Sequence, residues 1–555
     1  MKTETPYAIS LVLHANLPFV KKFTAPIRRL PVSDESNSDP QQEVPSDEMK
    51  NLPESVEESW FFEALSETYL PLLEMFSRLD GEHIPFRIGL SLSPVFAQML
   101  GDDLLLKKYS AYLDQQIDFG MKEMERVKDI PKMYRLAKHY FDRTVENKAV
   151  FTTRYEENIL KAFEYYRRKS NIEFLATTAT QAFIPFLCPY PEAVQAQIEV
   201  ALSYYRYSMG IFPQGFWLPE LGWAKELESY LRAYGFGYTI TDSHGFLFGS
   251  PPPSKGTFSP IKTPQGLYVL GRDFNASAGI SALHKNDVYR DNNRDIGYEL
   301  PVETLGSFLS KNGARYGTGY KYWKNGNGSN DELYDPAAAH DAAREHARSF
   351  LDDSCNRFST AAHYLKEQPV SLCAFNADSF GRLWHEGPYF LESLFRYAAG
   401  NPDIQFVTPS EYLNNQPCSS YEVSLPEFSS WGDNGYAETW LDSSNDWIYR
   451  HTNRSIERMV ELADRFSENS SLKERALNQA AREILLAQSS EWAAMLYRQE
   501  STGFARFQIE NSLKNFTAIY EALGSSHISA EWLTSLERQH NIFPNINYRV
   551  FRRKR

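Results

Sequence analysis

The sequence has few cysteines, no long apolar run and no excess of basic residues. Its four cysteines are Cys188, Cys355, Cys373 and Cys418, and no two have the short spacing of a zinc site or a redox motif. We therefore expect four buried thiols. No stretch approaches the roughly 18 consecutive apolar residues needed to span a bilayer, so we expect no membrane partner.

Basic residues are outnumbered by acidic ones. The 555 residues include 58 Lys and Arg against 71 Asp and Glu, a formal net charge of -13, which opposes binding to nucleic acid. In the first twenty residues, His14, Asn16 and Pro18 interrupt an apolar run, and no small-residue cleavage pattern follows. This start is interpreted as that of a mature cytoplasmic protein.

Aromatic side chains are in excess. The chain has 36 Phe, 33 Tyr and 10 Trp, together 14% of its residues. Flat rings can cover the apolar faces of sugars while their polar tips bind hydroxyl groups. An aromatic-rich core explains the same composition, so composition alone leaves both interpretations open.

Short apolar runs alternate with helical stretches along most of the chain. The expected strands are residues 8–13, 84–92, 172–178, 215–218, 237–241, 370–375 and 405–407. Most are followed directly by polar residues. Strands separated by helices, with polar residues at their carboxyl ends, are typical of a parallel α/β barrel with its site on that face. The fold class predicted is thus α/β, with about seven strands.

The chain is expected to form two domains. Residues 1–420 should hold the barrel, including an acidic loop at 31–58 and a helical insertion at about 95–168. The loop has nine acids against Lys50 alone, which favours a solvated segment. Residues 421–555 show apolar positions at helical spacing and few strand signals, so they should form a helical C-terminal domain.

Glu220 is the first candidate for chemistry. It lies in Gly-Phe-Trp-Leu-Pro-Glu-Leu-Gly-Trp, residues 215–223, where a short strand presents a carboxylate between Trp217 and Trp223. A carboxylate flanked by aromatic rings suits a glycosidic nucleophile, because the rings hold the sugar while the anion meets developing oxocarbenium charge. A surface or capping glutamate explains the pattern equally well.

A second candidate segment, residues 373–388, also follows a strand. The two-residue period of an extended chain predicts Asn376 and Asp378 on the same face, and of these two only Asp378 can donate or accept a catalytic proton. His385 and Glu386 lie in the same segment. They are either alternative acids or hydrogen-bonded support for the turn.

These segments resemble glycoside hydrolase family 57, in particular its α-1,4-glucan branching enzymes. The similarity covers nearly the whole chain, from the His14 segment to residues 541–550. The matching stretches are long and specific, and they include residues 60–73, 215–223, 241–245, 271–273, 430–432, 445–451 and 487–492.

The resemblance implies a distorted (β/α)7 barrel with a helical insertion and a helical C-terminal domain. It also implies retaining transfer on α-1,4-glucan such as glycogen, amylose or maltooligosaccharides, without metal or cofactor, Glu220 being the nucleophile and position 376 the acid/base. Glucose units would be clamped and stacked by Arg272, Trp431 and Trp440. The other candidate site residues are His14, Asn16, Gln181, Trp217, Asp242, His244 and Glu491. For Asp242 and His244 the alternative is a structural, hydrogen-bonded role.

Several site positions depart from the family pattern. The acid/base aspartate is Asn376, and asparagine can hydrogen-bond a glycosidic oxygen but cannot protonate it. Two family histidines are Asn16 and Gln181, a tryptophan is Ser281, and an aspartate is Glu491. General acid catalysis is worth about 10²- to 10⁴-fold. We therefore expect a branching enzyme with impaired or altered catalysis, Asp378 being a substitute acid, or else an inactive glucan-binding protein.

Overall fold

The computed structural model describes residues 6–20, 53, 55–309, 313–326, 332–365, 368–417, 420–466, 470–525 and 527–554. Most of the predicted acidic loop at 31–58 lies outside these residues. Cys418 does too.

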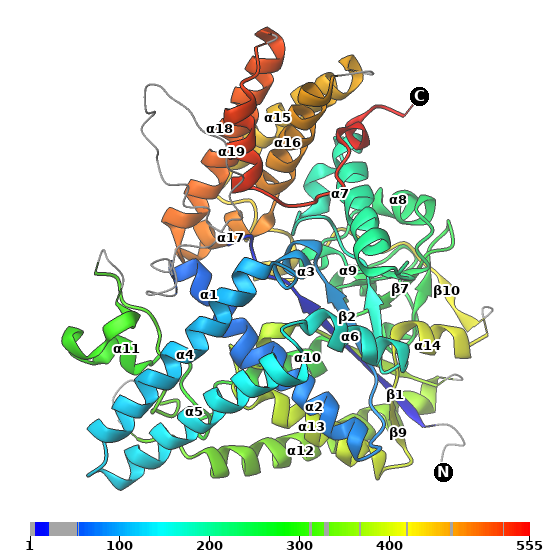
Figure 1. The fold of residues 1–555 in the computed structure, drawn as a ribbon. Coiled ribbons are helices and arrows are strands. Elements are labelled where there is room, and N and C mark those ends of the chain that lie inside the picture. The colour runs from blue at the N-terminus through cyan, green and yellow to red at the C-terminus, as the bar shows by residue number, and fades with distance from the viewer. Residues whose placement is uncertain are drawn as a thin grey trace.

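Seven parallel strands of the described chain form a closed ring. In order around it they are β1 (Tyr7–Ala15), β2 (Ile88–Leu92), β3 (Ile172–Leu175), β4 (Gly215–Phe216), β5 (Tyr238–Thr241), β7 (Tyr268–Gly271) and β8 (Val370–Asn376). Single parallel bridges, Ala176 to Phe216 and Arg272 to Leu372, join the two hydrogen-bonded sheets into one ring. The predicted α/β fold with a distorted (β/α)7 barrel is confirmed (Figure 1).

The strand predictions fail at two places. The predicted strand at 405–407 is β9 (Ile404–Phe406), which pairs with the first residues of β1 rather than completing the ring. The ring is completed by β7, which follows β6 (Ile261–Lys262) through a short turn. No helix separates these two strands, so the strand and helix alternation on which the prediction rests is missing there.

Burial explains the apolar strands. All nine residues of β1 and all five of β2 are buried, as expected for parallel strands covered on both faces. The predicted strand at 84–92 begins only at Ile88, because the Ile84 amide donates to the Leu79 carbonyl and ends the preceding helix.

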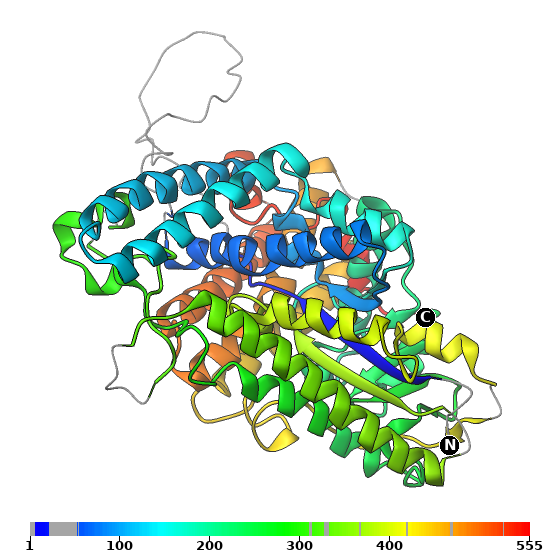
Figure 2. The same cartoon turned by 90° about the horizontal axis from the view of Figure 1, so that it is seen from below.

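Helices α1 (Val56–Ala64) and α2 (Leu70–Gly81) are joined by a π-helical turn at Leu65–Tyr69. Ser55 caps α1 by accepting from the Glu58 amide at 3.1 Å. The predicted helical stretch contains α4 (Asp103–Arg126), α5 (Pro131–Ala149) and α6 (Ile159–Arg168). Figure 2 shows α4 and α5 side by side, with α1 and α2 between them and strand β1.

Further helices cover the barrel and connect its strands. They are α3 (Pro94–Met99), α7 (Pro191–Tyr204), α8 (Leu227–Ala233), α9 (Ser243–Leu247), α10 (Phe274–Leu283), α11 (Ile296–Glu299), α12 (Pro336–Tyr364), α13 (Gly387–Ala399) and α14 (Pro409–Asn415). The short strand β10 (Glu422–Val423) pairs with β6.

The C-terminal part is helical. Its helices are α15 (Trp447–Arg465), α16 (Ser471–Ala487), α17 (Ser490–Arg498), α18 (Thr502–Ser525) and α19 (Ala530–Gln539). Helices α15, α16, α18 and α19 stand together at the top of Figure 1, while α17 lies lower, beside the barrel. The N-terminus of α17 is fixed to the barrel, because the Ser490 amide donates to the Gln181 carbonyl at 2.7 Å and Ser489 bridges Ala182.

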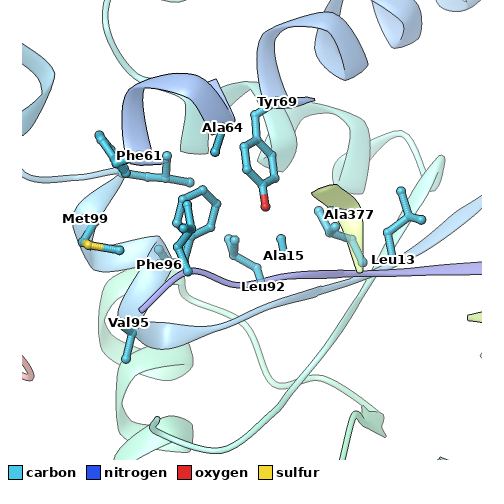
Figure 3. Packing of buried hydrophobic residues seen from close by; sticks show 14 of the residues in the cluster. Leu13, Ala15, Phe61, Ala64, Tyr69, Leu92, Val95, Phe96, Met99 and Ala377 are labelled. Atoms are coloured by element: carbon cyan, nitrogen blue, oxygen red, sulfur yellow. The ribbon is translucent and has the colours of Figure 1, made fainter. Parts of the chain in front are cut away.

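The core between α1, α2 and the barrel is closely packed (Figure 3). Phe96 is fully buried, and its ring lies 4.7 Å from that of Tyr69 and 6.2 Å from that of Phe61, measured between centroids. In Figure 3 the Tyr69 ring points toward Ala15 and Ala377, at the carboxyl ends of β1 and β8. This packing fixes the ends of the two strands that carry His14 and Asn376.

Replacing Phe96 by alanine should lower the free energy of unfolding by about 3–5 kcal/mol, because it removes a buried ring and leaves a cavity. Thermal and denaturant unfolding would measure the loss. The matched control is Phe248→Ala, since Phe248 is 67% exposed and its loss should change stability by less than about 0.5 kcal/mol. Equal effects of the two substitutions would contradict the packing.

The three described cysteines are unpaired. Cys373 is buried, as expected, whereas Cys188 and Cys355 are partly exposed, so the prediction of full burial is wrong for both. Cys188 follows a short 3-10 helix at the surface, where its thiol donates to the Ile184 carbonyl. No described helix is long and apolar enough to cross a membrane.

Candidate active site

Glu220 follows β4 in a strained backbone conformation. Its φ is 61° and that of Leu221 is 50°, the left-handed region that non-glycine residues rarely adopt. The Trp431 amide donates to the Glu220 carbonyl at 2.8 Å and helps to hold this turn. Strain of this kind costs of order 1–3 kcal/mol per residue and is concentrated at functional sites.

Three neutral donors hold the Glu220 carboxylate. Trp431 Nε1 donates to Oε2 at 2.6 Å, and Oε1 accepts from Ser490 Oγ at 2.9 Å and from Gln181 Nε2 at 3.3 Å. Each carboxylate oxygen can accept about two hydrogen bonds. Oε2 therefore keeps one accepting position, while the group stays fixed in orientation with no cation partner in the part of the chain that the structure describes.

Gln181 connects Glu220 to His14 on β1. Its Oε1 lies 2.9 Å from His14 Nε2, and His14 Nδ1 lies 3.0 Å from Ser91 Oγ on β2. Burial lowers the pKa of His14 to about 4, so the ring is neutral at physiological pH. Since an amide oxygen only accepts, Nε2 carries the hydrogen in this arrangement, and His14 fixes Gln181 in the orientation that donates to Glu220.

Glu491 is a second carboxyl close to Glu220. It is the second residue of α17, and it is partly exposed. Its Oε1 accepts from Asn16 Nδ2 and its Oε2 from Ser489 Oγ, both at 2.7 Å. Burial of the carboxyl group, reinforced by the negative charge of Glu220, raises the pKa of Glu491 to about 7. A substantial protonated fraction is therefore present near neutral pH.

Asn376 and Asp378 have different surroundings. Asn376 ends β8 opposite His14, with an exposed side chain that has no hydrogen-bond partner among the described residues. Asp378 is 8% exposed and accepts from Arg382 Nε at 2.9 Å. The prediction that both lie on one face is wrong, because the chain leaves the extended conformation after Asn376 and turns into a 3-10 helix.

Arg272 links Asp242 to Trp431, and His244 contacts the loop that follows Trp431. Arg272 Nη1 donates to Asp242 Oδ2 at 3.2 Å, and its guanidinium lies 5.9 Å from the centroid of the Trp431 ring. His244 Nε2 lies 2.7 Å from the Gly435 carbonyl. Arg272 and His244 are partly exposed, whereas Asp242 is buried. The structure thus brings the predicted Arg272 and Trp431 together beside Glu220.

Two of the predicted tryptophans are buried. Trp217 stacks on His14, with ring centroids 5.0 Å apart, and Trp440 stacks on Phe183 at 5.1 Å. At 1% exposure, Trp440 offers no ring face to a glucose unit, so its predicted stacking role is wrong. Ser281 is exposed on α10.

His385 and Glu386 lie inside the protein at 5% and 0% exposure. His385 Nδ1 lies 3.0 Å from Glu67 Oε2, and Glu386 Oε1 accepts from the Arg290 amide at 3.3 Å. Neither side chain can contact a glucan, so the structure favours support of the turn over an acid role.

Sequence reasoning missed Ser490, Ser489 and Ser91. Ser489, the N-cap residue of α17, and Ser490, its first residue, belong to the segment 487–492 that carries the family resemblance, but only Glu491 was singled out there. Ser490 lies 270 positions from Glu220 in the chain, a pairing that no local pattern indicates. Among the described residues, no group of three or more His, Cys, Asp or Glu side chains could hold a metal ion.

The described fold and site agree with comparisons to known proteins. Residues 46–426 match the family described as Glycosyl hydrolase family 57, and residues 451–551 match that described as 1,4-alpha-glucan branching enzyme, C-terminal. A curated relative, a 1,4-alpha-glucan branching enzyme of Thermococcus kodakarensis, is 24% identical over 474 residues, 81% of this chain and 68% of the relative.

Two solved structures cover nearly all of this chain. The novel alpha-amylase AmyC from Thermotoga maritima is 33% identical, covering 99% of this chain and 100% of its own, with a TM-score of 0.86. The GH57-type branching enzyme from Pyrococcus horikoshii is 23% identical, covering 100% and 98%, with a TM-score of 0.84. The chain described here belongs to glycosyl hydrolase family 57.

Proposed function

We propose that this protein transfers glucosyl units of α-1,4-glucan through a covalent intermediate on Glu220. The observation that carries the proposal is the carboxylate itself, which three neutral donors hold with one position of Oε2 free. An ionised, oriented oxygen is what attack on an anomeric carbon requires. Glycogen, amylose and maltooligosaccharides are the substrates proposed.

In the first step a Glu220 oxygen attacks the anomeric carbon and the glycosidic bond breaks. Donors from Trp431, Ser490 and Gln181 keep the carboxylate in place, and neutral His14 keeps Gln181 oriented. In the second step an acceptor hydroxyl attacks the same carbon, and the ester bond to Glu220 breaks. Two displacements retain the α configuration.

The acceptor distinguishes branching from hydrolysis. The match of the C-terminal helices to the C-terminal region of branching enzymes supports transfer to the 6-hydroxyl of another glucan chain. The similarity to a protein titled an alpha-amylase supports transfer to water. We propose branching as the main activity.

Mass spectrometry with an activated donor tests the proposal. Incubation of the protein with α-maltosyl fluoride, whose leaving group needs no proton, should release fluoride and add one maltosyl unit to the peptide containing Glu220. With amylose, iodine staining should fall and new α-1,6 linkages should appear by proton NMR. Reducing ends without α-1,6 linkages would identify hydrolysis instead.

Asn376 favours a second candidate function, a glucan-binding protein without turnover. If it stands at the acid/base position, the usual proton donor is absent. In that case amylose in a native gel should slow the migration of the protein, and yet the protein should release no fluoride from α-maltosyl fluoride. The absence of a covalent maltosyl adduct would contradict the proposed transfer through Glu220.

A further inference from the structure

A glucan leaving group must be protonated, and Asn376 cannot supply the proton. Its amide nitrogen carries hydrogens that it does not give up in water. Fluoride leaves without a proton, but the 4-hydroxyl of a glucose unit does not leave readily as an alkoxide. Turnover of natural glucan on Glu220 therefore needs another acid within reach of the substrate.

The acidic and imidazole groups around Glu220 are mostly unsuited to this role. Asp378 pairs with Arg382, and Asp242 accepts from Arg272 and from the Ser243 amide. Both have an arginine partner and are buried, at 8% and 4% exposure. His14 is 1% exposed, and burial keeps it neutral, with a pKa of about 4.

Glu491 differs from these groups in charge, contacts and exposure. It has no partner cation among the described residues, and it adjoins Ser490, whose hydroxyl contacts Glu220 Oε1. The residue as a whole is partly exposed, although its carboxyl group is buried. The negative charge of Glu220 also acts on the Glu491 carboxyl, so the two groups belong to one site. We propose that Glu491 donates the proton to the leaving glycosidic oxygen, in place of an acid at position 376. This inference rests on the proposed role of Glu220 as nucleophile.

Glu491 alone can account for the proton transfers of both steps. As Glu220 bonds to the anomeric carbon, the glycosidic bond breaks and the Glu491 proton moves to the departing oxygen. The Glu491 carboxylate then takes the proton of the incoming 6-hydroxyl, whose oxygen displaces Glu220. Both catalytic groups return to their starting protonation states.

The surroundings of Glu491 accommodate both of its protonation states. Asn16 donates to it through Nδ2, while Asn16 Oδ1 is buried without a partner among the described residues. Rotation of this amide would present the oxygen to a protonated carboxyl. After proton transfer, the anion lies in the first turn of α17, where the helix dipole stabilises negative charge. The raised pKa of Glu491, about 7, suits an acid that acts near neutral pH.

The experiment compares two donors in wild type and in Glu491→Gln. With maltoheptaose, kcat/KM should fall about 10²- to 10⁴-fold in the variant, the usual worth of a general acid. With α-maltosyl fluoride, the first turnover of fluoride release should change less than about threefold. Later turnovers should slow, because the base is gone, and sodium azide should restore them, since azide attacks without a base.

The pH profile supplies a second readout. Wild-type kcat/KM on maltoheptaose should decline above about pH 7, because Glu491 must be protonated to donate. Among the described residues, the titratable group that acts on it is Glu220, and its hydrogen-bond donors Asn16 and Ser489 are neutral. Glu491→Gln should lose this decline, and Glu491→Asp, which keeps a shorter carboxyl, should retain both the decline and part of the activity. Glu500→Gln, an exposed residue just after α17, is the control and should match wild type.

Each outcome supports or overturns the role of Glu491. Folded Glu491→Gln that keeps maltoheptaose turnover with an unchanged decline overturns it. If Glu491→Gln does not fold, a Glu491→Asp variant that turns over maltoheptaose without the decline above about pH 7 overturns it. If wild type releases fluoride but leaves maltoheptaose intact, the role of Glu491 as proton donor is overturned and Glu220 remains the proposed nucleophile. If wild type neither releases fluoride nor turns over maltoheptaose, both proposals are overturned.

Discussion

Replacing Glu220 by glutamine should lower kcat on both α-maltosyl fluoride and maltooligosaccharides by about 10⁴- to 10⁶-fold, the usual effect of removing a nucleophile. Glutamine has nearly the same shape, so the strained turn at Glu220 and Leu221 is retained. It lacks the charge that attacks the anomeric carbon. The loss should therefore appear with every donor, whatever its need for a proton.

The structure provides controls for Glu220→Gln. Ser490→Ala removes one of the three donors to the carboxylate and leaves the nucleophile, so it should retain a measurable maltosyl adduct. Glucan binding in affinity gels should persist in Glu220→Gln, because Arg272 and the partly exposed Trp431 are unchanged. A variant that still forms the adduct would show that another group attacks.

Local sequence patterns predicted much of the barrel because parallel strands buried on both faces leave a clear apolar signal. Six of the seven ring strands follow from such runs, including the fully buried β1. The seventh, β7, was missed because it follows another strand directly. Glu220 was found for a similar reason, since its short strand, proline and flanking tryptophans are contiguous in sequence.

The contacts that determine the chemistry could not be predicted in this way. Glu220 meets Ser490, and Asn16 meets Glu491 across 475 positions, so these pairs arise only when the C-terminal helices pack on the barrel. The surroundings of Asp378 depend on the end of β8 at Asn376, because the chain turns into a 3-10 helix directly after that residue. The burial of Trp440 depended on Phe183, which belongs to a distant loop.

The two carboxyls at the site are electrostatically coupled. The negative charge of Glu220 contributes to the raised pKa of Glu491. When Glu220 becomes an ester in the covalent intermediate, that charge disappears. The pKa of Glu491 should then fall, so the group is ionised in the step in which it must accept the proton of the incoming hydroxyl.

An acid placed at position 376 should rescue the loss of Glu491. In Glu491→Gln, adding Asn376→Asp should raise kcat/KM on maltoheptaose about 10²- to 10⁴-fold, the usual worth of a general acid, whereas Asn376→Asp alone should change wild type by less than about tenfold. The two substitutions act on one step, so their effects should be strongly non-additive in a double-mutant cycle.

The pH profile of the rescued variant should differ from that of wild type. Position 376 is exposed and its side chain has no hydrogen-bond partner among the described residues, so an aspartate there should titrate nearer the ordinary value of about 4. The decline in activity should therefore move from about pH 7 toward lower pH. Equal gains from Asn376→Asp with and without Glu491 would mean that the two positions act independently, and Glu491 would not be the proton donor.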